Sequence, residues 1–290
     1  MDKRIITVAF LLGTVFFHCN QLCAQVPIVQ PDLGAKTCVA PAFFGPNAFQ
    51  VPEMNDGRTV GNFQAEVAGD YFKGNLVKGA MDNTWDMFLK LRIPLFSDRV
   101  NLSLWAPLTE WYNTDRAVLD ARRVAPSVSG SGHEMGAAYV SVDILVLKES
   151  SARPSIVLRS VLRTALEDKA FGKGRSYDCP GYFFDVTAGK NLASTGFLCW
   201  QTDNGRQNDA VMFGILGEYF NPCFTLGAQY GGYVGWEKCG DFPRTLRVRC
   251  DAGPQKWTVR PYVQYQHGFS DWPFDQLRVG ITISLSRMSS

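Results

Sequence analysis

The chain has 290 residues, of which 46% are hydrophobic and 13% aromatic, and its formal net charge is +2. Lysine and arginine nearly balance aspartate and glutamate without forming a concentrated basic patch, which argues against a nucleic-acid partner. This composition fits a soluble protein as well as a membrane protein, so the pattern of residues along the chain must distinguish the two.

The first 25 residues have the pattern of a secretory signal peptide. Lys3 and Arg4 supply positive charge, an apolar run extends from Ile5 to Phe17, and a small-residue region ends near Ala24. The run is shorter than the roughly 20 residues that a membrane-spanning helix needs, and no later run reaches that length. We therefore predict that residues 1–25 direct export and are removed, in preference to an N-terminal anchor.

Residues 26–60 contain several prolines and show no regular period, so we expect an irregular N-terminal extension. Two interpretations remain open for it: an extension on the periplasmic side, and a plug that enters the mouth of a barrel.

From residue 61 to residue 290, apolar and polar side chains alternate with a period of two, which is typical of strands with one apolar face. Residues 140, 142, 144 and 146, for example, are apolar and alternate with a face that carries Asp143. The pattern predicts about 12 strands, an even number as single-chain outer-membrane barrels have. They cover residues 62–71, 85–93, 100–106, 136–147, 156–166, 182–188, 196–201, 211–219, 224–230, 246–249, 257–266 and 276–285.

The connections between these strands alternate in length. Short ones lie near residues 95–99, 148–154, 191–195, 221–223 and 251–255. Long ones lie near residues 74–82, 113–134, 167–180, 202–209, 235–244 and 268–274. Outer-membrane barrels have short periplasmic turns and longer extracellular loops, so the alternation favours a barrel with its long loops outside.

Aromatic residues gather at the predicted strand ends, as expected of rings at a membrane interface. Those assigned to the outer end are Trp111, Tyr112, Tyr182, Trp236 and Trp272, and those assigned to the inner end are Phe96, Phe220 and Trp257. We expect lipid to contact Leu89, Val142, Leu158 and Ile281.

The alternative fold is a soluble sandwich or jelly roll. Its turns would recur every ~8–12 residues, whereas strand and connection together average ~19 residues here. The sequence therefore predicts an all-β, up-and-down antiparallel transmembrane barrel.

Several stretches resemble one known family. These are Gly136–Leu147, the Pro154-x-x-x-Leu158-Arg159 strand, the run from Tyr177 to Asp185, and Gly189-Lys190. They resemble the outer-membrane transporter family named for the MetA pathway of phenol degradation. The resemblance implies a barrel in the bacterial outer membrane with a transport role, and it does not identify the cargo.

The last strand is similar to the recognition signal for the barrel-assembly machinery, which we expect as a partner. Arg278, Gly280, Ile283 and Leu285 fit its order of a polar residue, a glycine and alternate hydrophobic residues. The usual terminal aromatic residue is missing, because the chain continues to Ser290.

Charged residues on the polar faces are predicted to line the lumen. They are Glu66, Asp70, Asp86, Lys90, Arg92, Asp143, Arg159, Arg163, Asp185, Glu218, Arg247, Arg249, Arg260 and Arg278. Arginine and lysine side chains arranged around the lumen would favour the passage of anions along a polar path. The alternative is a network of mutually neutralising charges that fills a barrel of intermediate width.

No catalytic, metal or cofactor site is predicted. The cysteines beyond the signal peptide show no metal-binding spacing, and their pairing cannot be read from the sequence. Two histidines remain, His133 and His267, and an enzyme acting on lipids would need one of them next to a nucleophile such as Ser270.

The sequence thus predicts a passive channel of the outer membrane, for a small solute with apolar and aromatic compounds among the candidates. The expected partners are outer-membrane lipid, the barrel-assembly machinery and a small-molecule solute. Two alternatives remain: a barrel without transport that supports the envelope or displays binding loops, and, less favoured, a lipid-modifying barrel enzyme.

Overall fold

The structure is a computed structural model that describes residues 44–48, 50–95, 98–164, 175, 181–192, 196–203, 211–234 and 242–285. For residues 196–203 and 270, the backbone alone is described. The predicted signal peptide, residues 1–25, lies outside the described residues, as do residues 26–43.

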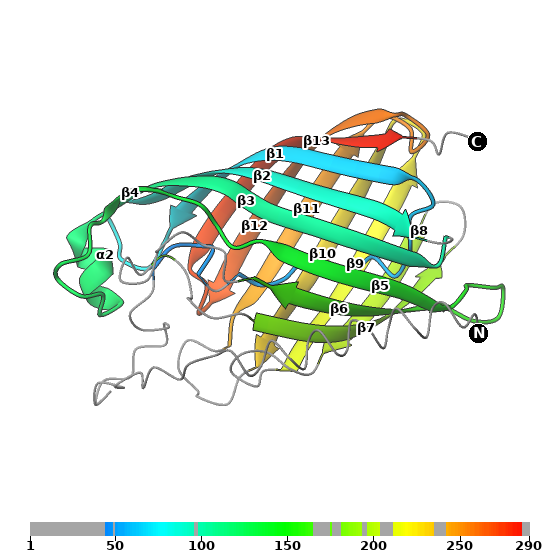
Figure 1. Cartoon of the computed structure of the whole chain (residues 1–290), viewed down its shortest axis with the longest axis horizontal. Coiled ribbons are helices and arrows are strands. Elements are labelled where there is room, and N and C mark those ends of the chain that lie inside the picture. The colour runs from blue at the N-terminus through cyan, green and yellow to red at the C-terminus, as the bar shows by residue number, and fades with distance from the viewer. Residues whose placement is uncertain are drawn as a thin grey trace.

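Antiparallel strands make up almost all of the described chain (Figure 1). In chain order the elements are β1 (Phe63–Gly74), β2 (Asp82–Leu95), β3 (Val100–Thr114), α2 (Arg116–Ala121), β4 (Ser131–Glu134), β5 (Tyr139–Leu147), β6 (Ser155–Arg163), β7 (Gly181–Asn191), β8 (Gly196–Asp203), β9 (Val211–Asn221), β10 (Phe224–Val234), β11 (Arg244–Ala252), β12 (Val259–Ser270) and β13 (Phe274–Leu285).

The strands close on themselves. β1 pairs with β2 on one side and with the last strand, β13, on the other, where Asp70 lies opposite Arg278. β4 pairs only with the end of β3, so twelve strands of the described chain form the barrel wall. The predicted all-β, up-and-down antiparallel barrel is confirmed. Among the described residues, no helix is long and apolar enough to cross a membrane.

Most connections alternate in length as predicted, but the last one does not: β12 ends at Ser270 and β13 begins at Phe274, a shorter connection than the one between Ala252 and Val259. β2 ends at Leu95 and β3 begins at Val100, whereas β3 ends at Thr114 and the next wall strand, β5, begins at Tyr139. We call the two ends of the barrel the short-connection end and the long-connection end. α2 and β4 both belong to the long-connection end (Figure 1), so the segment predicted as a polar loop at 113–134 contains a helix and a short strand.

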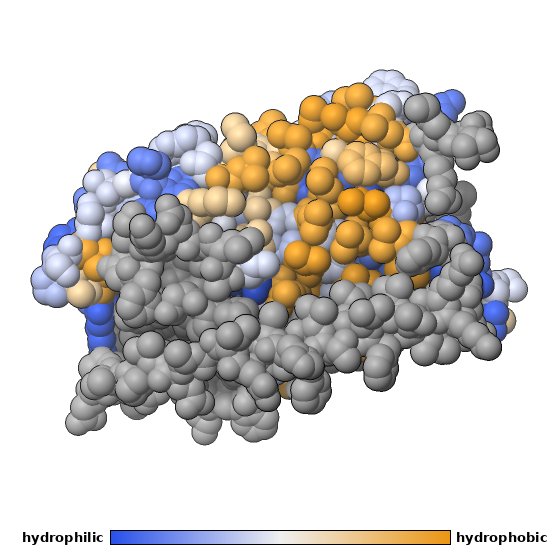
Figure 2. Space-filling model, in the orientation of Figure 1, coloured by the Kyte–Doolittle hydropathy of each residue, from blue (hydrophilic) through white to orange (hydrophobic). Residues whose placement is uncertain are grey.

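The outer surface of the barrel is apolar. Along β13, Val279 is 58% exposed while its neighbour Arg278 is 4% exposed, and β7 shows the same alternation. Figure 2 shows apolar side chains gathered over the strands, with hydrophilic residues toward both ends. Of the four residues expected to contact lipid, Leu158 and Ile281 are exposed, Leu89 is half-buried, and Val142 is buried on the same outer face. Contact with lipid stays a prediction. Soluble proteins rarely expose a continuous apolar surface of this kind.

The predicted aromatic belts need correction. Trp111 and Trp257 are about half exposed on the outer surface, but Tyr112, Trp272 and Phe220 point into the barrel. A β-bulge in β3 opposite Met87/Phe88 changes the phase of the alternation, which turns Tyr112 inward. Phe96 and Trp236 lie outside the described residues.

Candidate functional site

The charged residues predicted for the lumen all lie on the inward face of their strands. Those that are buried are Asp70, Asp86, Asp143, Arg159, Arg163, Asp185, Arg247 and Arg278, and those that are half-buried are Glu66, Lys90, Arg92, Glu218, Arg249 and Arg260. Many of them pair directly: Arg159 Nε lies 2.5 Å from Asp185, and Arg278 Nε lies 2.6 Å from Asp70. Their contribution to solute passage stays a prediction.

A stretch before the first strand runs through the lumen. We call residues 44–48 and 50–60 the lumen segment. At the long-connection end, the ring of Phe44 contacts the ring of Tyr112 edge-on, with 5.7 Å between the ring centroids. Phe44 also packs with Leu119 and Val124. The indole Nε1 of Trp272 donates to the carbonyl of Pro46 at 3.0 Å. The lumen segment therefore starts at the mouth formed by the long connections.

The middle of the lumen segment is held by charge. The carboxylate of Glu53 accepts hydrogen bonds from Lys90 Nζ at 3.2 Å and from Arg278 Nη1 at 3.0 Å. Its carbonyl accepts a third from Arg159 Nη2 at 3.0 Å. These three cations come from β2, β13 and β6, so side chains from three different strands of the wall bind Glu53.

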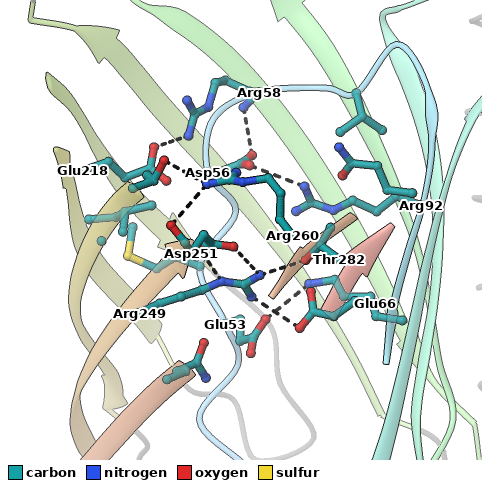
Figure 3. A pocket seen from close by; sticks show the side chains of 18 of the residues that line it. Glu53, Asp56, Arg58, Glu66, Arg92, Glu218, Arg249, Asp251, Arg260 and Thr282 are labelled. Carbon is teal, nitrogen blue, oxygen red and sulfur yellow. Dashed lines mark hydrogen bonds and ion pairs between the residues drawn. The ribbon is translucent and has the colours of Figure 1, made fainter. Parts of the chain in front are cut away.

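The lumen segment ends at the short-connection end. Asp56 pairs with Arg92 at 3.4 Å, and Arg58 pairs with Glu218 of β9 (Figure 3). The amide of Val60 donates to the side chain of Asn101 at 2.7 Å, just before the chain enters β1. The chain thus traverses the lumen from the long-connection end to the short-connection end.

Glycines give the lumen segment its space. A Cβ at Gly214 of β9 would lie 2.4 Å from Met54 Sδ, and one at Gly57 would lie 3.2 Å from the Cα of Gly189 in β7. Gly57 also has a φ of +69°, a conformation that favours glycine. At these two places the wall has a glycine, Gly214 or Gly189, and therefore no side chain.

A second polar cluster lies near the long-connection end. Asn47 Nδ2 donates to Asp86 and to Glu110, both at 2.6 Å, and Arg175 Nε donates to Glu110 at 2.7 Å. The guanidinium of Arg175 also lies 4.2 Å from the ring centroid of Tyr112. Sequence reasoning missed Glu53, Asp56, Glu110 and Arg175 as site residues; three of them lie outside any strand alternation, and the bulge in β3 hides the phase of Glu110.

Arg122 adds a buried cation to the same mouth. It follows α2, is 3% exposed, and lies 5.5 Å from the ring centroid of Phe274. Its Nε and Nη2 have no hydrogen-bond partner in the described part of the chain. Burial lowers the pKa of Arg122 to about 10, although the nearby Asp82 carboxylate opposes the shift.

A cavity of about 430 Å³ remains between the lumen segment and the wall, toward the short-connection end (Figure 3). Arg249 crosses it, pairing with Glu66 at 3.3 Å and Asp251 at 3.0 Å. Its charged lining consists of Glu53, Asp56, Arg58, Glu66, Lys90, Arg92, Glu218, Arg247, Arg249, Asp251 and Arg260. The cavity is thus the open, charged part of a lumen that the chain itself partly fills.

The described residues contain no group of three or more His, Cys, Asp or Glu side chains that could hold a metal ion. Cys223 and Cys250 are free thiols, and the side chains of the other cysteines lie outside the part of the chain that the structure describes. His267 lies on the outer face of β12, where Nδ1 is 2.6 Å from Asp275 Oδ1. Ser270, the nucleophile considered for His267, has a side chain that lies outside the described residues.

No protein-family model and no curated protein matches the chain. Two solved structures with similar folds are an outer-membrane channel from Pseudomonas putida F1 and the NanC porin. The first is 10% identical, covers 81% of this chain and 100% of its own, and has a TM-score of 0.60. The second is 12% identical, covers 76% of this chain and 100% of its own, and has a TM-score of 0.53. The chain therefore has the fold of outer-membrane channel barrels; the closer resemblance to the phenol-degradation family is not confirmed.

Proposed function

We propose that the chain is a passive channel of the bacterial outer membrane that admits small solutes. The observation that carries the proposal is the closed ring of strands, apolar outside and charged inside, with a cavity in its lumen. An apolar outer belt suits lipid tails, and a charged interior suits water and polar solutes. The likeness to channel barrels supports the same assignment and favours transport over catalysis.

The lumen segment is the resting closure of this channel. Barrels of about eight strands are filled by side chains, and those of about sixteen or more leave an aqueous channel. In this barrel of twelve strands, the lumen segment fills much of the intermediate space. The segment is not one of the strands whose ladders form the wall. The segment can therefore move without breaking the ladders that hold the barrel.

The charged lining of the cavity favours polar solutes over the apolar and aromatic compounds that were among the candidates from the sequence. The cavity presents charged side chains on both the wall and the lumen segment. An apolar solute would strip water from these charges without replacing it, which costs free energy. A polar or charged solute can replace that water with its own hydrogen bonds.

The proposal also assigns partners to two surfaces. Outer-membrane lipid would cover the belt that includes Val67, Ile215 and Val279. The barrel-assembly machinery would bind the last strand, β13, which closes the barrel by pairing with β1.

Planar-bilayer conductance tests the proposal. The full chain is compared with a variant in which residues 44–58 are replaced by a Gly/Ser sequence of equal length. The full chain should show brief openings, and the variant a steady conductance, because the ion pairs of Glu53, Asp56 and Arg58 are gone. If both proteins fold and insert, and neither passes ions or small solutes, the channel function is wrong.

A further inference from the structure

The cavity contains hydrogen-bond donors without acceptors. Nε2 of Gln229, Nε2 of Gln264 and Nε of Arg260 have no partner among the described residues. Gln229 is 7% exposed and Gln264 is 2% exposed, and both line the cavity. A buried donor left without an acceptor is unfavourable, because its desolvation is not compensated. The lining of the cavity therefore includes donors that the described chain leaves unsatisfied.

The charges of the lining leave two cations without a carboxylate partner. All five acidic groups have one: Glu53 with Lys90 and Arg278, Asp56 with Arg92, Glu218 with Arg58, and both Glu66 and Asp251 with Arg249. Within the described chain, Arg247 and Arg260 form no ion pair. Arg247 donates to Gln266 at 2.8 Å and Gln229 at 3.1 Å, and Arg260 donates to Thr225 at 3.1 Å. The charges in the cavity that have no partner of opposite sign are therefore positive.

We propose that this cavity binds a small organic anion that carries a carboxylate or a phosphate. Such a group supplies negative charge and several acceptor oxygens, which matches both the unpaired cations and the unpaired donors. The inference rests on the proposed channel function and specifies the class of solute that the channel admits.

The strand register places these groups along one track. Gln229 of β10 lies opposite Arg247 of β11, and Gln264 of β12 lies opposite Arg249. Arg260 precedes Gln264 on the same inward face of β12, about 13 Å away along the strand at ~3.3 Å per residue. The anionic group is held by Arg260 near the short-connection end, and polar oxygens along the rest of the solute accept from Gln264 and Gln229.

Gly227 makes room for the solute. It lies on the inward face of β10 and lines the cavity, and a Cβ built on it would have its nearest neighbour at 3.8 Å. That nearest neighbour is Glu218 Cγ at an ordinary van der Waals distance, so a larger side chain at residue 227 can extend into the cavity without displacing the wall.

Equilibrium binding by titration calorimetry tests the proposal on the full chain in detergent micelles. The probes are gluconate and inorganic phosphate, with glucose as the uncharged match for gluconate. Gluconate should bind and glucose should not. Arg260→Gln should weaken gluconate binding ~10-fold or more, because a charge-assisted hydrogen bond is lost. Arg153→Gln, an exposed arginine of a short connection, removes the same charge outside the cavity and should change nothing.

Gly227→Val provides a second test that changes no charge, and it should abolish gluconate binding in a protein that still folds and inserts. The proposal is overturned if gluconate and glucose bind equally, or if Arg260→Gln and Arg153→Gln have the same effect. The conductance of the Gly/Ser variant reports on the channel separately. Conductance without anion binding removes this inference and leaves the channel, while anion binding without conductance supports the site and removes the channel.

Discussion

The carboxylate of Glu53 lies 3.0 Å from the guanidinium of Arg278, although 225 residues separate them in the chain. The same guanidinium holds Asp70 of the first strand at 2.6 Å. Arg278 thus joins the seam that closes the barrel to the segment that fills it. Closure of the wall and occupation of the lumen are therefore supported by one side chain.

Glu53→Gln should loosen the lumen segment. The substitution keeps the shape of the side chain but removes the charge that Lys90 and Arg278 contact, and we expect a loss of about 1–3 kcal/mol in the binding of the segment to the wall. The fraction of time the channel is open in planar bilayers should rise. Asp120→Asn, at an exposed position of α2, is the control and should leave the open fraction unchanged. Equal open fractions in the two variants would contradict the role of Glu53.

Gly214→Val should have a similar effect through packing. The new Cβ would lie 2.4 Å from Met54 Sδ and 2.8 Å from its Cγ, so Met54 must move. Overpacking of this kind costs about 1–3 kcal/mol. Conductance should increase while the barrel stays folded. Gly217→Val, in the same strand but with no atom within 4 Å of its Cβ, should behave as the unmodified protein does. A closed Gly214→Val channel would argue against contact with Met54.

The long-connection end should be accessible from outside the cell. Phe44 packs against Tyr112 and Leu119 at the long-connection end, which we propose faces the exterior. An epitope tag inserted after Ser127, an exposed residue between α2 and β4, should therefore bind antibody on intact cells. A tag in the short connection at residues 151–153 should bind only after the outer membrane is permeabilised. The reverse result would mean that the barrel has the opposite orientation.

Arginine on the outer belt should destabilise the protein according to its depth in the bilayer. Val279 is 58% exposed near the middle of β13, and Leu285 is 50% exposed at its end. Arginine costs about 2–4 kcal/mol at the centre of a bilayer and about 0–1 kcal/mol near its surface. Urea unfolding in lipid vesicles should therefore show a large loss for Val279→Arg and a small one for Leu285→Arg. Two small and equal losses would mean that lipid does not cover the belt.

The wall of the barrel could be predicted from sequence because strand alternation is a local signal. The inward position of Arg278 and the outward position of Val279 follow from a period of two. The aromatic assignments failed where that period breaks. The bulge in β3 reverses the faces after Pro107, so Tyr112 turns inward while Trp111 stays on the surface.

The lumen segment could not be placed from sequence for a different reason. Its residues have no period, and each contact that holds it joins positions far apart, such as Arg58 with Glu218. The sequence showed only that prolines prevent a regular element there. The wall glycines Gly214 and Gly189 were a faint signal, because a wall that leaves room for a passing chain needs small residues.

A cross-link between Met54 and Gly214 tests most directly whether the lumen segment passes through the barrel. With cysteine at both positions, the side chains should be close enough for the Cβ separation of about 3.5–4.5 Å that a disulfide needs. Oxidation in isolated membranes, followed by mass spectrometry of the joined peptides, should detect the 54–214 disulfide and a channel that stays closed. The pair at 54 and 217 should not form, because Gly217 faces outward. Absence of the 54–214 disulfide, or equal formation of both, would contradict a segment that threads the lumen.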